Sequence, residues 1–327
     1  MKGAISKVSP FLKGLLGVGI LAWMISSGKI DLHQLGRSLA HWALMLAILA
    51  LAYAQILITA WRWRLLLRAQ EIPLSFNRAW GLTMIGALFN VAIPGAVSGD
   101  LIKGYYITRA MQGRKTHAAT SILMDRVTGL IGLLFLGAAG VASNLSEALR
   151  TPAARSLGAA TFAAFFGGIG GLYAALYAGD RLSRWSGLPG IVRTVFSALH
   201  EYRRQSSAVP VALALSIVNQ AITCSCFYLA LRSAGVAGLP SGQFFLIAPL
   251  GFVAISLPIA PAGVGVGQAA FYALFQVIAP GYAAAGTAAF TAFQAVFILV
   301  CLTGLFWYIP YKHVEIPAVA EGKSGAM

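Results

Sequence analysis

The sequence contains few charged residues, and this scarcity excludes a water-soluble globular domain. Only 10% of its 327 residues are charged, whereas 58% are hydrophobic. Soluble domains carry about 25% charged residues, so this chain could not cover a globule with polar surface. Its mean hydropathy of +0.78 indicates that lipid is its main solvent.

Cysteine and histidine are also scarce, which argues against a metal centre or an enzyme active site. Three cysteines, with Cys224 and Cys226 inside an apolar run, provide neither a disulfide framework nor a metal-ligand set. The five histidines lie near the ends of apolar runs, without metal-ligand spacing such as H-E-x-x-H. We therefore expect a protein that is not an enzyme and that needs no cofactor.

Positive charge is in excess, but its distribution does not indicate nucleic-acid binding. The 24 Lys and Arg give a formal net charge of +15 and form short clusters between apolar runs. Clusters in these places are the orientation signals of membrane proteins. We therefore expect no nucleic-acid partner.

Six apolar runs are long enough to span a membrane, which takes about 20 mostly apolar residues in a helix. The first run has no convincing cleavage site near its end and precedes further spans, which favours an uncleaved anchor. The sequence predicts one all-α transmembrane domain over residues 1–327. The spans cover approximately residues 11–27, 42–60, 118–141, 156–179, 210–231 and 283–310.

Two further apolar stretches, residues 79–99 and 242–280, are interrupted by proline and glycine. Proline removes a backbone donor and clashes with the preceding turn, while glycine frees the backbone. Non-helical backbone at membrane depth persists only where protein or a wet cavity satisfies it. We predict two re-entrant or broken helical hairpins; a proline-kinked ordinary span is the alternative. The interrupting residues are Pro94, Gly95, Pro258, Pro261, Gly263, Gly265 and Gly267.

The basic residues favour the re-entrant arrangement. If the N-terminus is cytoplasmic and each hairpin returns to its own side, eighteen Lys and Arg lie inside, including Arg62 and Lys103, and five lie outside. This is the bias of the positive-inside rule. A full crossing at 79–99 would instead put the basic cluster 103–115 outside. We expect a multi-pass protein of the bacterial cytoplasmic (inner) membrane with both termini in the cytoplasm.

This topology divides the chain into two halves, approximately 11–141 and 156–310. Each half consists of two spans, a hairpin and another span, and the hairpins open to opposite sides. Inverted repeats with interrupted helices are a common plan of transporters, whose binding sites lie at the repeat interface. Sequence similarity between the halves is weak, so the inverted relation is inferred from topology.

Polar residues near the first interruption could bind a lipid headgroup. Asp100 and Lys103 are three residues apart, so on a helix they share a face and can pair. Gly99 belongs to a glycine-rich turn with Asn90, and such turns and helix starts present N–H groups to anions. Lys103 and Arg109 would add positive charge. The alternative is a structural ion pair at a helix start.

Asp125 and Arg126 lie deep within the predicted span 118–141. Arg126 is nine residues beyond His117, or about 13 Å along a helix. A charge at the centre of a span costs about 2.5–3.5 kcal/mol, so it needs a partner or a water-filled cavity. Arg126 could contact a headgroup, or pair with Asp100 or Asp125 to lock helices together; both hypotheses stay open.

The segment from Pro258 to Gln268 combines two prolines with glycines at alternate positions. Such glycines let a backbone approach another helix or a ligand closely. Gln268 could face the cavity or satisfy freed backbone groups. For Asn219 and Gln220, hydrogen bonding between helices is the favoured role.

Three motifs in order along the chain carry a family resemblance. They are RWR followed by FNVAIPGAVSGDLIKGYY, then SILMDRVTGLIGLL, and finally PIAPAGVGVGQAAF. The sequence resembles the transmembrane region of lysylphosphatidylglycerol synthase, a family that includes stand-alone flippase-like proteins. The resemblance covers essentially the whole chain.

The resemblance implies lipid translocation, without the soluble aminoacyltransferase domain of the synthases. We expect only the translocating part here, because few polar residues follow the last span. One departure concerns Gln268, where the family often has Glu, so coupling or headgroup recognition could differ. The resemblance points to Pro94, Gly95, Gly99, Asp100, Asp125, Arg126, Pro261, Gly263 and Gly267.

The sequence thus favours a flippase-like transporter of an anionic or isoprenoid-linked lipid. Two alternatives remain: a scaffold that binds lipid or a lipid or glycan biosynthetic enzyme, and an ion or solute transporter. A membrane lipid is the expected partner. Neither its headgroup nor an oligomeric state follows from the sequence.

The predicted topology can be tested by cysteine labelling in a background that lacks Cys224, Cys226 and Cys301. An impermeant thiol reagent added to intact cells should label a cysteine at position 150 and leave one at position 114 unlabelled, because the basic cluster before 115 is retained inside. Labelling at position 114 from outside would contradict the re-entrant arrangement.

Overall fold

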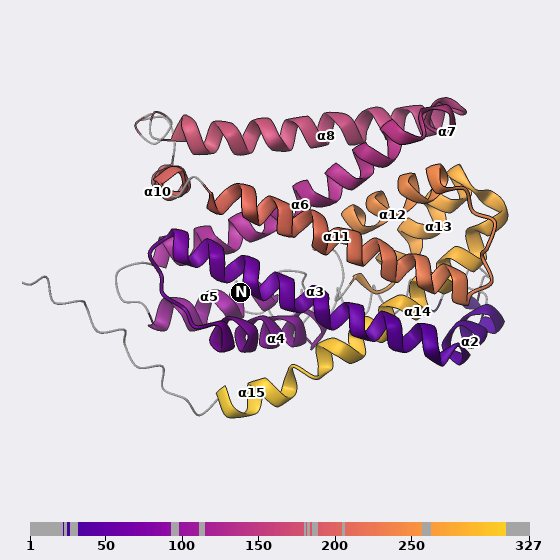
Figure 1. Ribbon diagram of the computed structural model, residues 1–327, viewed down its shortest axis with the longest axis horizontal. Coiled ribbons are helices and arrows are strands. Elements are labelled where there is room, and N and C mark those ends of the chain that lie inside the picture. The colour runs from indigo at the N-terminus through magenta and orange to yellow at the C-terminus, as the bar shows by residue number, and fades with distance from the viewer. Residues whose placement is uncertain are drawn as a thin grey trace, which may run out of the picture.

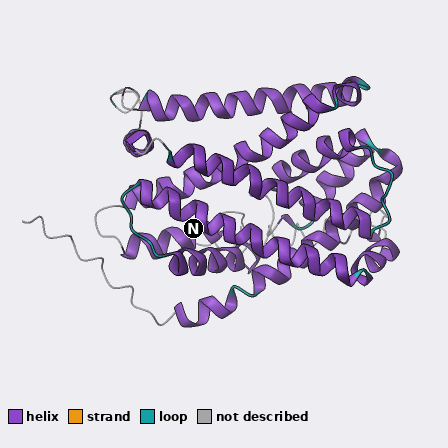
Figure 2. Ribbon diagram, viewed as in Figure 1, coloured by secondary structure: helices purple, strands orange, loops and turns teal. Residues whose placement is uncertain are grey.

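The described part of the chain is a bundle of helices (Figure 1, Figure 2). The computed structural model describes residues 22, 25–26, 32–92, 98–110, 115–179, 181, 184, 189–204, 207–256 and 263–311. In these ranges every regular element is helical, which confirms the all-α prediction for them. The elements are α2 (Leu32–Ala40), α3 (Trp42–Ala69), α4 (Phe76–Ala92), α5 (Ser98–Ala110), α6 (Lys115–Ser143), α7 (Leu145–Leu149), α8 (Pro152–Tyr177), α10 (Gly190–Glu201), η1 (Tyr202–Arg204), α11 (Ala208–Ser233), α12 (Ser241–Ser256), α13 (Val266–Ile278), η3 (Pro280–Tyr282), α14 (Ala283–Leu302) and α15 (Leu305–Tyr311).

Five described segments are long and apolar enough to cross a membrane: α3, α6, α8, α11 and the stretch Pro280–Pro310. They correspond to five of the six predicted spans, whereas the predicted span 11–27 lies almost wholly outside the described residues. Large apolar side chains such as Trp42, Leu101 and Phe306 are exposed on the outer surface. The protein is therefore a polytopic membrane protein whose outer surface suits lipid.

Helix α3 is longer than predicted, because it continues beyond residue 60 to Ala69. Residues 61–69 contain neither glycine nor proline, so nothing in them ends the helix. Arg62 therefore lies within the helix and is buried. Arg62 is therefore set apart from the exposed basic residues with which the sequence analysis counted it.

Each interrupted stretch contributes two short helices, α4 with α5 and α12 with α13. The predicted breaks at Pro94-Gly95 and Pro258–Pro261 lie outside the described residues, which resume at Ser98 and Gly263. Gly263 and Gly265 have φ of 70° and 78°, a left-handed conformation that favours glycine. The chain therefore enters α13 through two positions whose backbone conformation only glycine adopts at little cost.

The helices of each pair run antiparallel and are in close contact. In the first pair, Gly99 packs directly on Gly86: a Cβ at Gly99 would lie 2.1 Å from the Gly86 carbonyl oxygen. The Ser98 hydroxyl donates to the Phe89 carbonyl at 2.8 Å, close to this contact. In the second pair, the ring of Phe271 covers Gly251. Both pairs are therefore helical hairpins held together by small residues.

Helices α3 and α11 run antiparallel through the centre of the bundle (Figure 1). Three contacts fix their register: Cys226 Sγ with the Ile48 carbonyl at 4.0 Å, Gln55 with Thr223 at 2.8 Å, and Arg62 with Ser216 at 2.7 Å. The α4–α5 hairpin lies toward one end of the long axis and the α12–α13 hairpin toward the other. The two hairpins thus lie toward opposite ends of the long axis, beside the central pair.

The glycine contact in the first hairpin can be tested by Gly99→Ala. The new methyl group meets backbone on the facing helix, so we expect a destabilisation of about 1–3 kcal/mol, typical of overpacking. Thermal unfolding of the detergent-purified protein measures this change. Gly170→Ala in α8 is the matched control, because no atom lies within 4 Å of the added Cβ; it should stabilise the helix by up to about 1 kcal/mol. Equal stability of the two variants would contradict the close packing.

Candidate functional site

A cavity of about 390 Å³ lies where the two hairpins approach the central helices. The first hairpin contributes Asn90 and Asp100, and the second contributes Ser256 and Gly263. Residues of both hairpins therefore border one space. The polar side chains that line it are Gln55, Thr59, Arg62, Asn90, Asp100, Lys103, Asp125, Arg126, Gln220, Thr223 and Ser256.

The Asp100 carboxylate contacts two positively charged side chains of the cavity. Arg126 Nε lies 2.5 Å from Asp100 Oδ2, and Lys103 Nζ lies 4.0 Å from Asp100 Oδ1. The Lys103 ammonium also lies 5.0 Å from the centre of the Trp63 ring, a cation–π contact. Of the two hypotheses for Arg126, pairing with Asp100 is realised in this structure. Because this pair lies at a cavity, headgroup contact stays a prediction.

Arg62 and Asp125 form a second, closed ion pair. Arg62 Nε donates to Asp125 Oδ1 at 2.7 Å, and Arg62 Nη1 donates to the Ser216 hydroxyl at 2.7 Å. The pair joins α3, α6 and α11 and is almost fully buried, with side-chain exposures of 6% and 10%. A buried charge needs such partners, because leaving either one unpaired costs several kcal/mol.

Arg62 is the charged residue of the described lining that sequence reasoning missed. It was counted among the cytoplasmic basic residues because it follows a span that was expected to end at residue 60. A signal was nevertheless present: Gln55, Thr59 and Arg62 are spaced three to four residues apart, a polar stripe on one helix face. All three line the cavity.

The two ion pairs differ in their access to the surroundings. The Arg126 side chain is 41% exposed, whereas the Asp100 side chain is 11% exposed. On α6 the exposed residues Leu123 and Leu130 flank Arg126 at helical spacing, so Arg126 lies on the outward stripe of that helix. The cavity therefore has a side opening at Arg126, next to apolar surface.

The charged lining has a positive excess. Three cations, Arg62, Lys103 and Arg126, face two carboxylates, Asp100 and Asp125. Because Arg62 and Asp125 neutralise one another, the open part of the cavity holds two cations against one carboxylate. Such a space favours an anion, and its effect is strengthened by the low dielectric of the interior.

Neutral polar side chains in the lining, and Asn219 beside it, lie where the helices are in contact. Gln220 Nε2 donates to the Gly129 carbonyl at 3.1 Å, which links α11 to α6 as expected. Gln55 Nε2 donates to Thr223 Oγ1, whereas the buried Gln55 Oε1 and Asn219 Oδ1 accept from no described residue. Buried acceptors of this kind are usually satisfied by water or a ligand.

Two predicted binding residues lie away from the cavity. Arg109 is exposed in the last turn of α5, where its guanidinium donates to the Tyr105 hydroxyl at 3.1 Å. Gln268 is buried at the start of α13, where Oε1 accepts from the Gly265 N–H at 2.8 Å and Nε2 donates to Gln294 at 2.7 Å. Gln268 thus satisfies freed backbone, the other role considered for it, and it is not among the residues that line the cavity.

The glycines of the second interrupted stretch, residues 242–280, have separate roles. Gly263 lines the cavity, whereas Gly267 packs against the Phe290 ring and Ile255. The predicted residues Pro94, Gly95, Pro258 and Pro261 lie outside the described residues. Their predicted role as backbone hinges stays a prediction.

Comparison with known proteins gives one match. The family described as lysylphosphatidylglycerol synthase TM region matches residues 11–302. Neither the curated proteins nor the solved structures contain a match. The matched range includes every described residue that lines the cavity.

The closed ion pair can be tested by a double-mutant cycle. Arg62→Met or Asp125→Asn alone should destabilise the protein by about 3–5 kcal/mol, because the remaining partner is buried without its counter-charge. The double variant should lose clearly less than the sum of the two. Thermal unfolding in detergent measures all three, and Arg78→Met, an exposed change, should shift stability by no more than about 0.5 kcal/mol. Strict additivity would contradict a coupled buried pair.

Proposed function

Because the chain belongs to the lysylphosphatidylglycerol synthase transmembrane-region family, we propose that it is a flippase-like transporter of an anionic or isoprenoid-linked lipid. The observation that carries this proposal is the cavity between the two hairpin ends, with two cations against one carboxylate in its open part. Its volume of about 390 Å³ falls within the range of small-ligand pockets, about 300–1,000 Å³. A lipid headgroup fits a space of this size.

The proposed re-entrant character of the hairpins follows from their length. Helices α4 and α12 have 17 and 16 residues, and α5 and α13 have 13 each. At 1.5 Å per residue the longer ones reach about 26 Å and the shorter ones about 20 Å. The hydrocarbon core is about 30 Å thick. A helix of this length that enters from one side would end within the membrane, where the cavity lies.

Helix pairing supports the proposed inverted halves. α5 packs on α6 as α13 packs on α14, and α12 contacts α6 as α4 contacts α14. The central helices α3 and α11 would be equivalent, and their antiparallel course is what an inverted relation requires. The two halves would then enclose the cavity at their interface.

Basic side chains support the proposed orientation. One end of the bundle holds twice as many described arginine side chains as the other, so we place it in the cytoplasm. The richer end carries Arg64, Arg68, Arg78, Arg109, Arg181, Arg184, Arg193 and Arg203, and the other carries Arg37, Arg150, Arg155 and Arg232.

In the proposed mechanism, the lipid phosphate competes with Asp100 for Arg126. The Arg126 side chain is 41% exposed, so a phosphate can reach it from the apolar surface beside Leu123 and Leu130. Arginine can bind a phosphate through two parallel hydrogen bonds, and Lys103 adds a second charge. The acyl or isoprenoid chains would stay in the membrane beside Leu123 and Leu130. The buried Arg62–Asp125 pair would not exchange and would hold the helices around the site.

The proposal is tested by Arg126→Ala in vesicles that contain the purified full-length protein. We expect translocation of a fluorescent phosphatidylglycerol to slow by at least about tenfold, equivalent to about 1.4 kcal/mol. Arg78→Ala, an exposed change outside the cavity, is the matched control and should retain the wild-type rate. Thermal unfolding of each variant separates a lost contact from a lost fold.

The same assay distinguishes the alternatives. Wild-type translocation by a folded Arg126→Ala variant would remove this residue from the mechanism. Absence of translocation of both phosphatidylglycerol and a fluorescent isoprenyl phosphate by the wild-type protein would favour the scaffold function, in which lipid is bound without transport.

A further inference from the structure

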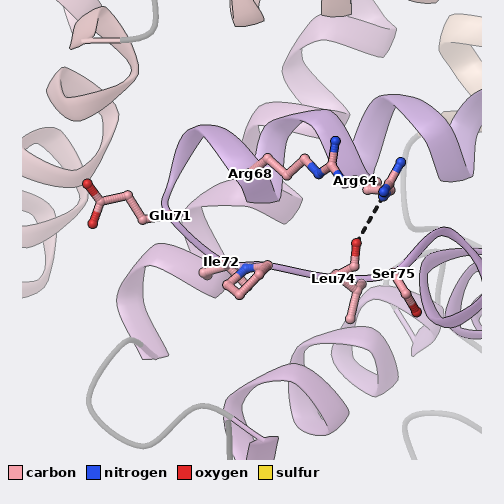
Figure 3. Close-up of a pocket in the computed structure, with 7 residues that line it drawn as sticks. Arg64, Arg68, Glu71, Ile72, Leu74 and Ser75 are labelled. Carbon is pink, nitrogen blue, oxygen red and sulfur yellow. Dashed lines mark hydrogen bonds between the residues drawn. The ribbon is translucent and has the colours of Figure 1, made fainter. Parts of the chain in front are cut away.

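A second cavity lies at the end of α3 that carries its basic residues, apart from the central one (Figure 3). Its volume is about 450 Å³, and it lies between the last turns of α3 and the extended connection to α4. None of its lining residues lines the central cavity. They are Arg64, Arg68, Glu71, Ile72, Pro73, Leu74 and Ser75.

Arg64 is held in position at this cavity. Its Nε donates to the Leu74 carbonyl oxygen at 2.9 Å, which ties the side chain to the connection before α4. This bond uses one of the five donors of a guanidinium. Because the side chain is already ordered, less rotamer entropy is lost when it binds an anion.

Arg68 brings a second positive charge to the same face. It lies four residues beyond Arg64, one turn along α3, and both residues line the cavity. The acidic residue of the lining, Glu71, points away from the two arginines in Figure 3. Like charges at this spacing repel one another. A bound anion between them would convert this repulsion into attraction.

The position of the cavity along α3 favours a membrane anion. Ser75 is part of the lining, but its hydroxyl points away from the two arginines in Figure 3 and accepts from the Arg78 N–H at 3.4 Å. The cavity follows the apolar part of α3, at the level where headgroups meet a membrane protein. A phosphate group carries several oxygens that can accept from both arginines.

We propose that Arg64 and Arg68 form a phosphate-binding site, separate from the central cavity. The ligand is a phosphate-bearing anion, either the headgroup of a phospholipid or free phosphate. Since the site is built on the connection that leads into the first hairpin, its occupancy would fix the base of that hairpin against α3.

The test uses the full-length protein in a non-ionic detergent and follows its unfolding temperature. It is titrated with phosphatidylglycerol in mixed micelles and, separately, with inorganic phosphate; a ligand that binds the folded state raises this temperature. A response to phosphatidylglycerol alone identifies a lipid site, and a response to both identifies a general phosphate site. A wild-type protein that responds to neither overturns the proposal.

Variants assign the response to this cavity. Arg64→Gln/Arg68→Gln should weaken the apparent affinity by at least about tenfold, since a hydrogen bond to a charged group contributes about 1.5–3 kcal/mol. Arg181→Gln/Arg193→Gln removes the same charge from exposed positions at the same end and should respond like the wild type. An equal loss in both pairs would indicate non-specific attraction and overturn the proposal.

Two single variants complete the design. Arg68→Gln alone changes an exposed residue without disturbing the Arg64–Leu74 bond, so it should fold and still weaken binding by about tenfold; an unchanged response would overturn the site. Arg126→Gln should remove only the part of the response that the central cavity contributes, so Arg64→Gln/Arg68→Gln should weaken binding as much in the Arg126→Gln background as in the wild type. If Arg64→Gln/Arg68→Gln causes no loss in that background, the anion binds in the central cavity and not at Arg64 and Arg68, and the proposal is overturned.

Discussion

A backbone that leaves the helical conformation within a membrane must find hydrogen-bond partners in protein or in water, since an unsatisfied group costs several kcal/mol. Under the proposed re-entrant arrangement, both hairpins of this protein face that constraint. The described ends of both hairpins border one polar cavity, next to the two ion pairs. Gln268 shows the constraint at a single residue, because its side chain replaces a helical partner for the Gly265 N–H. The cavity is thus a consequence of the interrupted helices as much as a site for a ligand.

Close approach of backbones makes this arrangement possible. Lipid provides no hydrophobic driving force between helices, so association depends on packing and on small residues. Gly99 on Gly86 brings Asp100 and Lys103 toward the central helices, and Gly267 lets α13 pack against the Phe290 ring. A side chain at either glycine would move polar groups of the cavity, or their supports, by ångströms.

The two ion pairs differ in burial, and therefore in the roles they can have. Arg62–Asp125 is buried and joins three helices, so breaking it leaves a charge without solvent. Arg126–Asp100 is open at Arg126, whose side chain is 41% exposed. The chain therefore places two similar pairs in one cavity with different access to the surroundings. Under the proposed function, the buried pair holds the bundle together while the open pair remains available to an anion.

The sequence alone determined the helical class, the positions of five spans and the two interruptions, because hydropathy and proline act locally along the chain. It also indicated Asp100, Lys103, Asp125 and Arg126, since charges in apolar runs are costly wherever they occur. Only the tertiary structure decided their partners: Asp125 pairs with Arg62 of α3, 63 residues away, and Arg126 pairs with Asp100. The structure also places Gln268 and Arg109 outside the lining of the central cavity. Which charges pair depends on which helix faces meet. The packing of the whole bundle decides which faces meet, and no local sequence pattern encodes that packing.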